Sequence, residues 1–253
     1  MQARDDVGGP SGGSTPEQAR SAQRTRNHLL NVLTADDYAR LSPTLERVQV
    51  KLLDVAAKRG EPFTHIYFPE TCVISLVNFM SDGNGVEAGT IGNEGFAGLA
   101  AYLEANLSES KTFCQVAGEA LRIPVNDVVR AAAESKSLRL MLNRYVQAYL
   151  SQVAQSVACN RLHDIEKRCA RWLMMTHDRV DQSQPFVLKH EFLALMLGVR
   201  RAGVTTAAGA LQDKGLIRYR RGSIRILDRE GLSASACECY GLVRKQFDQL
   251  FLG

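Results

Sequence analysis

The most specific pattern in this 253-residue chain is the run of residues 189–217, KHEFLALMLGVRRAGVTTAAGALQDKGLI. A first helix is expected to end at Gly198, because a residue without a β-carbon lets the backbone turn sharply. A second helix follows, with Val204, Ala208 and Leu211 at the spacing of one buried helical face. Two helices joined by so tight a turn predict a helix-turn-helix, whose second helix enters the major groove of DNA.

The residues after the second helix predict a wing. Residues 217–226 alternate between apolar and polar side chains across the turn Arg220-Arg221-Gly222-Ser223, a pattern typical of a β-hairpin with a basic tip. Cationic residues therefore fall at the start of the second helix and at the hairpin tip, where base edges and phosphates would lie. The alternative, two packed core helices beside a solvated hairpin, gives no reason for that placement of charge.

Charge is distributed unevenly along the chain, although the formal net charge is only +4. Residues 27–130 contain 8 Lys and Arg against 13 Asp and Glu, a net charge of −5, whereas residues 164–225 contain 12 against 6, a net charge of +6. A basic second half indicates contact with a polyanion. On charge alone, it is an equally good explanation that both halves have solvated surfaces whose net charges differ by chance.

The N-terminal half is expected to form a disordered tail followed by a β-rich domain. Residues 1–26 are rich in Gly, Pro and Ser and lack apolar periodicity, so they bury too little surface to offset chain entropy. Asn27 and Thr34 are then each expected to cap a short helix. Short β-type runs separated by Gly and Pro turns predict an antiparallel sandwich or barrel within residues 27–130. The runs lie near Val48, Thr64, Cys72, Val86, Phe113 and Ala120.

A long helix is expected to connect this domain to the helix-turn-helix. Apolar residues recur at helical spacing from about residue 131 to residue 163, and a stripe of this length exceeds what one small β-domain could cover. We therefore predict a dimerisation helix with its seam at Leu142, Val146, Leu150, Val153 and Val157. The alternative is a long helix packed on its own domain.

The fold class predicted is α+β, with five segments. They are a tail (1–26), an antiparallel β-barrel (27–130), the dimerisation helix (131–163), the winged helix-turn-helix (164–235) and a C-terminal helix (236–253). No apolar run approaches the roughly 18 residues of a membrane span, and residues 1–26 contain no apolar core behind a basic start, so no secretory signal is expected. The chain is therefore expected to be cytoplasmic, with reduced thiols.

Patterns of catalysis and metal binding are weak. His190-Glu191 begins a zinc-protease motif that has no second histidine, and no glycine pattern here has the context of a nucleotide-binding loop. Cys237-Glu-Cys239 is a pair of thiols, but the sequence offers no second pair for zinc. We therefore expect no enzyme activity, no metal and no cofactor. A redox sensor that uses Cys237 and Cys239 is an alternative, supported only by the closeness of the two cysteines in the sequence.

Residues 27–230 resemble the Crp/Fnr-type transcriptional regulators of bacteria. The likeness rests on Leu-Gly-Val-Arg-Arg at 197–201, Lys-Gly-Leu-Ile at 214–217, Asp164-Ile165 with Arg168 and Ala170, and Gly92-Asn93-Glu94-Gly95-Phe96. The order of segments is also that of the family. The resemblance implies a cyclic-nucleotide-binding-like domain, a dimerisation helix and a winged helix-turn-helix.

The resemblance also implies roles for individual residues of the helix-turn-helix. Arg201 stands where the family's first recognition-helix arginine reads guanine, and a guanidinium can bridge guanine O6 and N7. Arg200 replaces the family's usual Ser or Thr cap, and Thr206 replaces its second base-reading arginine, so a different operator is expected. Thr205 and Thr206 complete the base-reading set. The phosphate candidates are Lys189, His190, Arg200, Arg220 and Arg221.

The sensor half departs further from the family. An Arg-Ser pair neutralises the phosphate in cyclic-AMP-binding members, whereas the aligned residues here are Ser110 and Lys111. With Gly92, Glu94 and Gly95 of the preceding turn they form a weak candidate effector pocket. Lysine lacks the bidentate geometry of arginine, which disfavours cyclic AMP. Residues 1–71 contain no cysteine, so the N-terminal iron–sulfur cluster of other members is excluded.

The sequence thus predicts a homodimeric regulator that binds a palindromic operator in double-stranded DNA, under control of an unidentified small-molecule effector. RNA polymerase is an expected partner, and a membrane is not. One alternative is a constitutive DNA binder whose β-domain is only a scaffold. Another is a protein-interaction module whose helix-turn-helix no longer binds DNA.

Overall fold

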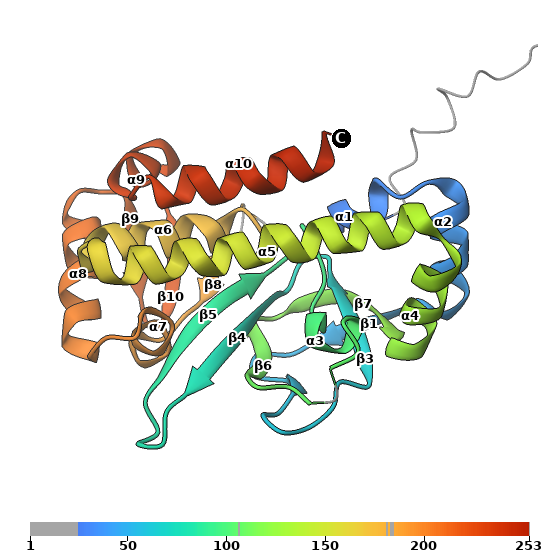
Figure 1. Cartoon of the computed structure of the whole chain (residues 1–253). Helices are drawn as coiled ribbons and strands as arrows, with labels where there is room; N and C mark the ends of the chain where they lie inside the picture. The colour runs from blue at the N-terminus through green and yellow to red at the C-terminus, as the bar shows by residue number, and fades with distance from the viewer. Residues whose placement is uncertain (1–24, 106, 181, 183–184, 253) are drawn as a thin grey trace, which may run out of the picture.

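The structure, a computed structural model, describes residues 25–105, 107–180, 182 and 185–252. The N-terminal part is β-rich, a long helix crosses the molecule, and a mainly helical part with a small sheet follows (Figure 1). The α+β class is as predicted. Among the described residues, no helix has the length and apolar character to cross a membrane.

The predicted tail extends two residues too far. Residues 1–24 lie outside the described residues, but Thr25 is 5% exposed and its hydroxyl donates to the Glu70 carboxylate. The backbone N–H of Arg26 donates to the same carboxylate at 3.0 Å. These two residues are therefore held against the β-domain.

The two short helices that follow begin at their predicted caps. Asn27 precedes α1 (His28–Asn31) and accepts from the N–H of Leu30 at 3.1 Å. Thr34 precedes α2 (Ala35–Leu41) and accepts from the N–H of Asp37 at 3.1 Å. The 3₁₀ helix η2 (Ser42–Thr44) leads into the first strand.

Two antiparallel sheets form the β-domain, and neither closes on itself among the described strands. One has the order β1 (Glu46–Val50), β7 (Gly118–Pro124) and β3 (His65–Pro69). The other has the order β2 (Val55–Ala57), β6 (Lys111–Val116), β4 (Val73–Phe79) and β5 (Gly85–Ile91). The domain is therefore better described as a sandwich than as a barrel. The short elements β2 and α3 (Leu99–Tyr102) had no counterpart in the sequence pattern.

The helix predicted across residues 131–163 is interrupted. The structure has α4 (Val125–Glu134) and α5 (Lys136–Leu162), separated by Ser135 in an extended conformation. Ser135 caps α5 by accepting from the N–H of Leu138 at 3.3 Å. Apolar spacing continues through this break, which is why the pattern alone did not reveal it.

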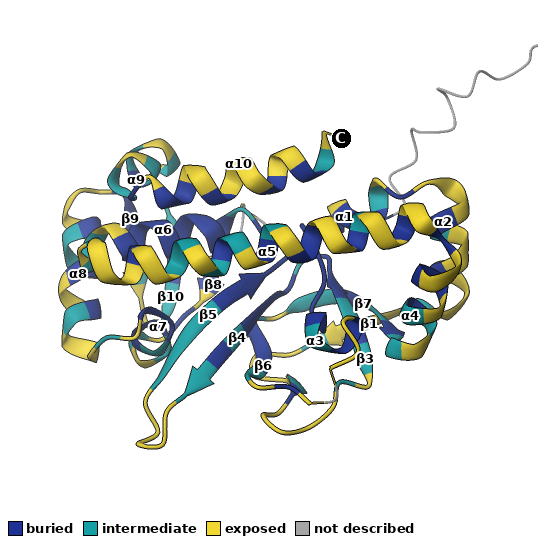
Figure 2. Cartoon of the chain, viewed as in Figure 1, coloured by how far each residue is buried: buried dark blue, intermediate teal, exposed yellow. Residues whose placement is uncertain are grey.

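The predicted seam is split between two faces of α5. Leu142 and Val146 are buried in the chain's own core, at 0% and 8% exposed, so these two assignments to a seam are wrong. Leu150 and Val157 are 55% and 68% exposed, while Val153 is half-buried. Figure 2 shows exposed residues along the length of α5 on the face toward the viewer.

The C-terminal part begins with α6 (Ile165–His177), capped by Asp164 as predicted. The remaining elements are β8 (Phe186–Val187), α7 (His190–Leu197), α8 (Arg201–Asp213), β9 (Ile217–Arg220), β10 (Ser223–Ile226), α9 (Arg229–Ser235) and α10 (Cys239–Phe251). Helix α10 packs along α5 (Figure 1). The C-terminal segment therefore returns toward the N-terminal domain.

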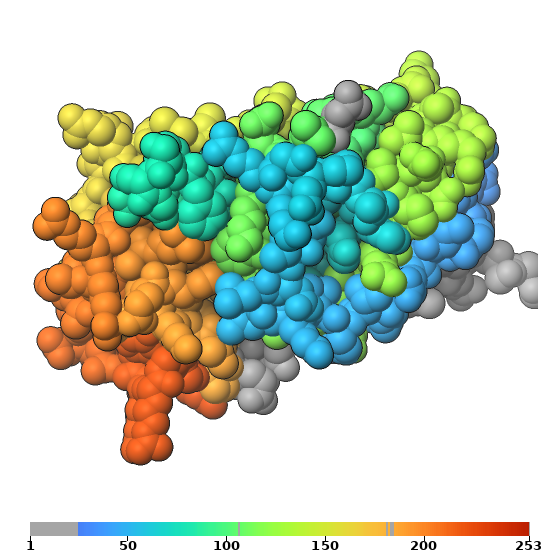
Figure 3. Space-filling view, turned by 90° about the horizontal axis from the view of Figure 1, so that it is seen from below, coloured from blue at the N-terminus to red at the C-terminus, as the bar shows by residue number. Residues whose placement is uncertain are grey.

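The β-domain and the C-terminal part share a buried interface. Helix α7 packs on β5, and the rings of Phe113 and Phe192 lie 6.0 Å apart across this contact. Glu94 forms an ion pair with Arg179 at 2.8 Å, with both side chains less than 10% exposed. Figure 3 shows the teal β-strand segment in direct contact with the orange C-terminal segment. Apolar and buried ionic contacts therefore join the two parts in this structure.

Candidate nucleic-acid interface

The helix-turn-helix forms where the sequence predicts it. Helix α7 ends at Gly198, whose φ of +61° is left-handed, and α8 begins three residues later at Arg201. A β-carbon on Gly198 would also lie 2.8 Å from the side chain of Val86, so glycine fits the turn in two ways. The buried face of α8 consists of Val204, Ala207, Ala208 and Leu211.

The three predicted base-reading residues lie on the exposed side of α8. Arg201, Thr205 and Thr206 are all exposed. The hydroxyls of Thr205 and Thr206 donate to the carbonyls of Arg201 and Ala202, each at 3.2 Å. Each hydroxyl oxygen keeps lone pairs for an outside donor, and each methyl group can contact an apolar edge.

Arg201 has a partner that the sequence argument missed. Its Nη1 lies 3.0 Å from Oε1 of Glu191, and the two side chains are 66% and 60% exposed. An exposed pair of this kind stabilises by only about 0–1 kcal/mol, so a base or phosphate can replace the carboxylate. Glu191 was noticeable in the sequence only as part of an incomplete zinc motif.

The N-terminus of α8 is open to an anion. Arg200 occupies the N-cap position, where its side chain makes no capping hydrogen bond to the described backbone. The first N–H groups of a helix carry partial positive charge and lack partners within the helix. Arg200 is itself exposed beside them. A DNA phosphate would satisfy these groups.

The wing is a two-residue hairpin with a basic tip. Strand β9 pairs with β10 from Ile217 to Ile226, and β8 pairs with the other edge of β10. Arg221 and Gly222 have φ of +52° and +76°, the left-handed geometry of a tight hairpin turn. Arg220 and Arg221 are exposed, as is Lys189 before α7. The phosphate candidates therefore lie on several separate elements.

His190 differs from the other phosphate candidates because it is half-buried. Its ring centroid lies 4.4 Å from that of Tyr219, and its Nδ1 lies 3.2 Å from the Thr205 hydroxyl. Burial, and then the nearby Arg201, lower the pKa of His190. The ring forms a contact between α7, α8 and β9.

The weak effector pocket is not assembled as one site. Ile91, next to Gly92, pairs with Ile74, whereas Lys111 pairs with Val77 three residues along β4. At about 3.3 Å per residue this separation is about 10 Å. Lys111 instead lies over the Phe113 ring, with 5.6 Å from Nζ to the ring centroid.

Other contacts occupy the remaining residues of that predicted pocket. Ser110 donates to Asn78 at 2.6 Å, and Glu94 is bound by Arg179. A β-carbon on Gly95 would lie 1.8 Å from the Tyr145 ring. The turn at residues 92–95 therefore packs against α5 and against Arg179, just beyond α6. The same turn borders a pocket of about 270 Å³ beside α10, which is not lined by Ser110 or Lys111.

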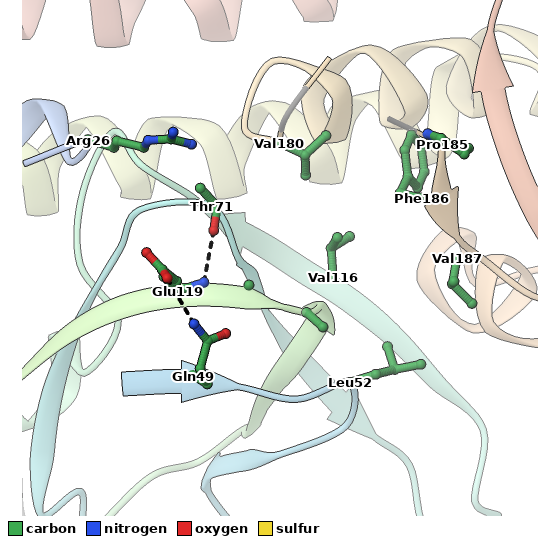
Figure 4. A pocket seen from close by; sticks show the side chains of 12 residues that line it. Arg26, Gln49, Leu52, Thr71, Val116, Glu119, Val180, Pro185, Phe186 and Val187 are labelled. Carbon is green, nitrogen blue, oxygen red and sulfur yellow. Dashed lines mark hydrogen bonds between the residues drawn. The ribbon is translucent and has the colours of Figure 1, made fainter. Parts of the chain in front are cut away.

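A cleft of 590 Å³ lies elsewhere, between the β-domain and the segment that contains β8. One wall is polar and includes Arg26, Thr71 and Glu119, while Val180 and Phe186 line the opposite apolar wall (Figure 4). Glu119 accepts from the Gln49 amide at 2.8 Å. Residues from both parts of the molecule thus face one space.

Cysteine ligands are also brought together against expectation. Cys237 and Cys239 were set aside for lack of a second pair, but the structure places Cys159 and His163 beside them. These residues come from the end of α5, which no sequence pattern associates with the C-terminal segment. The structure thus brings to the two thiols a second pair of possible ligands that the sequence did not show.

Comparisons with known proteins support this architecture. A family model described as the Crp-like helix-turn-helix domain matches residues 167–235. FixK2 from Bradyrhizobium japonicum superposes with a TM-score of 0.65 at 14% identity, covering 76% of this chain and 98% of that chain. A Crp/Fnr-family transcriptional regulator from Thermus thermophilus gives 0.59 at 21% identity, covering 76% and 98%.

A third solved structure is the c-di-GMP-responsive global regulator CLP of Xanthomonas campestris. It superposes with a TM-score of 0.58 at 16% identity, covering 76% of this chain and 99% of that chain. A search of curated proteins finds no match. At these identities the superpositions show a shared fold.

Proposed function

This chain has the fold of a Crp/Fnr-type transcriptional regulator and carries a Crp-like helix-turn-helix domain, and from that premise we propose that it reads a palindromic DNA operator as a homodimer. The observation that carries the proposal is the surface of α8. Arg201, Thr205 and Thr206 share its exposed side, next to an uncapped helix N-terminus. Arg201 reads a guanine, and the two threonines contact the neighbouring base pairs.

Phosphate contacts flank these base contacts in the proposed complex. Arg200 and the N-terminus of α8 bind one phosphate, while Arg220 and Arg221 bind others from the wing. Lys189, immediately before α7, adds a further charge. Such contacts supply affinity and position α8 without selecting a sequence.

The proposed dimer uses the exposed face of α5. Leu140, Leu150 and Val157 are 49%, 55% and 68% exposed and are separated by ten and seven residues. Gln147 and Ala154 are also exposed and lie between them at helical spacing. A second copy of this helix would cover that stripe, in the manner of a two-stranded coiled coil.

Signal control acts through the interface between the β-domain and the C-terminal part. The buried Glu94–Arg179 pair and the α7 contact with β5 hold one arrangement of these parts. A ligand in the 590 Å³ cleft would contact both and would favour one arrangement over another. Movement of α8 relative to its partner then changes DNA affinity, as in a rigid-body switch.

A constitutive DNA binder is the second candidate. The observation in its favour is that Glu94 is already bound by Arg179, and that Lys111 lies on the opposite side of β4 from the strand that leads to Gly92, offset by about 10 Å along β4. In that case the β-domain serves only to hold α5 and α6. A small molecule that raises the melting temperature of the protein would argue against this candidate.

Selection of bound duplexes from a random pool tests the DNA-reading proposal. Wild-type protein is expected to enrich a two-fold palindrome with half-sites about one helical turn apart. Arg201→Ala should lose preference at one base pair per half-site, while Arg130→Ala, an exposed arginine on α4, should select the wild-type sequence. A pool without enrichment, together with no salt-dependent binding to any duplex, would overturn the proposal.

A further inference from the structure

Four side chains with metal-binding atoms meet where the end of α5 touches the start of the C-terminal segment. Cys159 lies in the last turns of α5, and His163 caps its C-terminus. Cys237 and Cys239 lie more than 70 residues further along, just before and at the start of α10. Cys159, Cys237 and Cys239 are buried and His163 is half-buried. The cluster lies outside the DNA-facing surface and outside the 590 Å³ cleft.

The distances in this cluster match the edges of a small tetrahedron. The Sγ atoms of Cys159 and Cys237 are 3.5 Å apart, and Sγ of Cys239 is 3.5 Å from Nδ1 of His163. One ligand atom from each of the four residues lies within 4.8 Å of the others. Tetrahedral zinc, with Zn–S of about 2.3 Å and Zn–N of about 2.0 Å, has S–S edges of about 3.8 Å and S–N edges of about 3.5 Å.

Neighbouring polar groups already orient the ligands. Nε2 of His163 lies 3.2 Å from Oε1 of Glu238, which leaves Nδ1 directed toward the thiols. Nε2 of Gln155 donates to Sγ of Cys239 at 3.0 Å. A histidine held by a carboxylate on one nitrogen and a thiolate that accepts an amide hydrogen bond are typical surroundings of a metal site.

Two buried arginines are an independent indication that the four-residue cluster carries negative charge. Arg168 and Arg171 are 9% and 7% exposed, and their Nε atoms lack a hydrogen-bond partner among the described residues. Arg168 interacts electrostatically with Cys159 and Cys237, and Arg171 with Cys159. Three thiolates and one divalent cation carry a net charge of −1, which two adjacent guanidinium groups stabilise.

We propose that Cys159, His163, Cys237 and Cys239 bind one Zn²⁺ ion in tetrahedral geometry. Four protein ligands leave no open position, so the ion has a structural role. It fastens residues 236–253 to the end of α5, two residues before α6 begins. The site thus lies at the joint between the proposed dimer helix and the DNA-binding part, although the proposal does not depend on DNA binding.

Binding is coupled to the loss of protons, because thiolates and not thiols hold zinc. Each cysteine that enters the site as a thiol releases its proton to solvent, up to three in all, and His163 binds through neutral Nδ1. A [4Fe–4S] cluster fits less well, since each of its thiolates binds a separate iron and these sulfurs are too close together for that. A Cys159–Cys237 disulfide would leave His163 and Cys239 without a role.

Metal analysis of the full chain, purified without chelator or affinity metal, tests the site. We expect about one zinc per chain, falling to less than about a tenth in Cys159→Ser and in Cys239→Ser. The matched control is Cys169→Ala, a fully buried cysteine of α6 outside the cluster, which should keep its zinc. Circular dichroism of each variant establishes that it folds.

Cobalt provides a readout that does not depend on what is bound during expression. Co²⁺ added to the chelated wild-type chain should give the intense ligand-field bands of a tetrahedral site and sulfur-to-metal charge transfer. His163→Cys should retain the metal with stronger charge transfer, whereas His163→Ala should lose it. Chelation should lower the melting temperature of the wild type, and Zn²⁺ should restore it.

Four results would overturn the proposal. They are a folded wild-type chain that binds neither zinc nor cobalt, zinc retained in both serine variants, iron with acid-labile sulfide in place of zinc, and a metal-free chain with a Cys159–Cys237 disulfide.

Discussion

Arg201 and Glu191 form an exposed ion pair at the start of α8, where we propose that a base edge docks. The carboxylate holds the guanidinium at 3.0 Å, so in the proposed complex DNA displaces Glu191 to reach Arg201. The wing presents a simpler surface, with Arg220 and Arg221 exposed on a turn of fixed geometry. Specificity is thus expected from α8 and affinity from the wing.

Arg221→Asn isolates the charge of the wing tip from its geometry. Asparagine tolerates the left-handed φ of +52° at this position, so the turn should persist. We expect weaker binding to all duplexes alike and a salt dependence of log K that is shallower by about 0.9. Fluorescence anisotropy at several salt concentrations measures both. A loss confined to the operator would show that Arg221 reads bases.

Residue positions were predictable from the sequence where local chemistry decides them. Gly198, the caps at Asn27, Thr34 and Asp164, and the turn at Arg221-Gly222 all follow from backbone preference. The Glu191–Arg201 pair and the meeting of Cys159 with Cys237 depend on how separate elements pack. No spacing in the sequence carries that information.

At the scale of elements, the break between α4 and α5 depends on a buried carboxylate. Asp37 of α2 accepts hydrogen bonds from the hydroxyls of Ser135 and Ser137 at 2.5 and 2.6 Å. Ser135 uses the same oxygen to cap α5. Helix propensity favours one continuous helix here, and this tertiary contact overrides it, which explains why the sequence pattern missed the break.

The stability of this contact should depend on pH. Burial works to raise the pKa of Asp37, but hydrogen bonds from Ser135 and Ser137 outweigh it and hold the pKa below the usual value of 3.8. The stabilisation is therefore present above that value and is lost as pH falls through the lower pKa of the folded state. Asp37→Asn should destabilise the protein at about pH 6, and the difference from wild type should shrink as pH falls below 3.8, as measured by urea unfolding at several pH values. A difference that does not change with pH would contradict this.

The exposed face of α5 makes a prediction about assembly. Leu150→Glu with Val157→Glu places charge on two side chains that are already exposed, so folding should be unaffected. The double variant should sediment as a monomer at micromolar concentration and the wild type as a dimer. Leu242→Glu, which changes a residue of α10 that is 48% exposed, is the control and should remain dimeric. A wild-type protein that sediments as a monomer would contradict the proposed dimer contact along α5.

At the scale of the whole molecule, the β-domain and the C-terminal part are joined by buried polar contacts. Arg179 binds Glu94, Gln152 and the Met175 carbonyl, which ties the turn at residues 92–95 to α5 and α6. Trp172 donates to Glu87 at 3.1 Å across the same interface. Such contacts have strict geometry, so the molecule is suited to discrete arrangements of its parts.

Arg179→Met should be costly because it leaves a buried carboxylate without its partner. We expect the free energy of unfolding to fall by about 3–5 kcal/mol. Glu94→Leu with Arg179→Met should recover part of that loss. The control Arg40→Met removes an exposed pair with Glu134 and should cost less than about 1 kcal/mol. Equal losses in the two single variants would show that burial of the Glu94 pair is unimportant.

The order of the large parts along the chain was predictable from the sequence, because periodicity and turn signals determine it. How these parts pack against one another was not predictable. The sequence indicated an effector pocket at Glu94 and Lys111, but Glu94 is paired with Arg179 in an interface, and the 590 Å³ cleft lies between Arg26 and Phe186. Nor could the pattern tell which face of α5 its own chain covers, since Leu142 and Leu150 look alike in sequence.

A thermodynamic cycle between Arg201 and its base pair tests most directly whether α8 reads DNA. The selected operator and a version with the guanine pair replaced are each titrated with wild type, Arg201→Ala and Arg130→Ala. The base change should weaken wild type and Arg130→Ala by about 1–3 kcal/mol, or about 5- to 150-fold, and leave Arg201→Ala nearly unaffected. If the base change weakens all three proteins equally, Arg201 does not read that base pair.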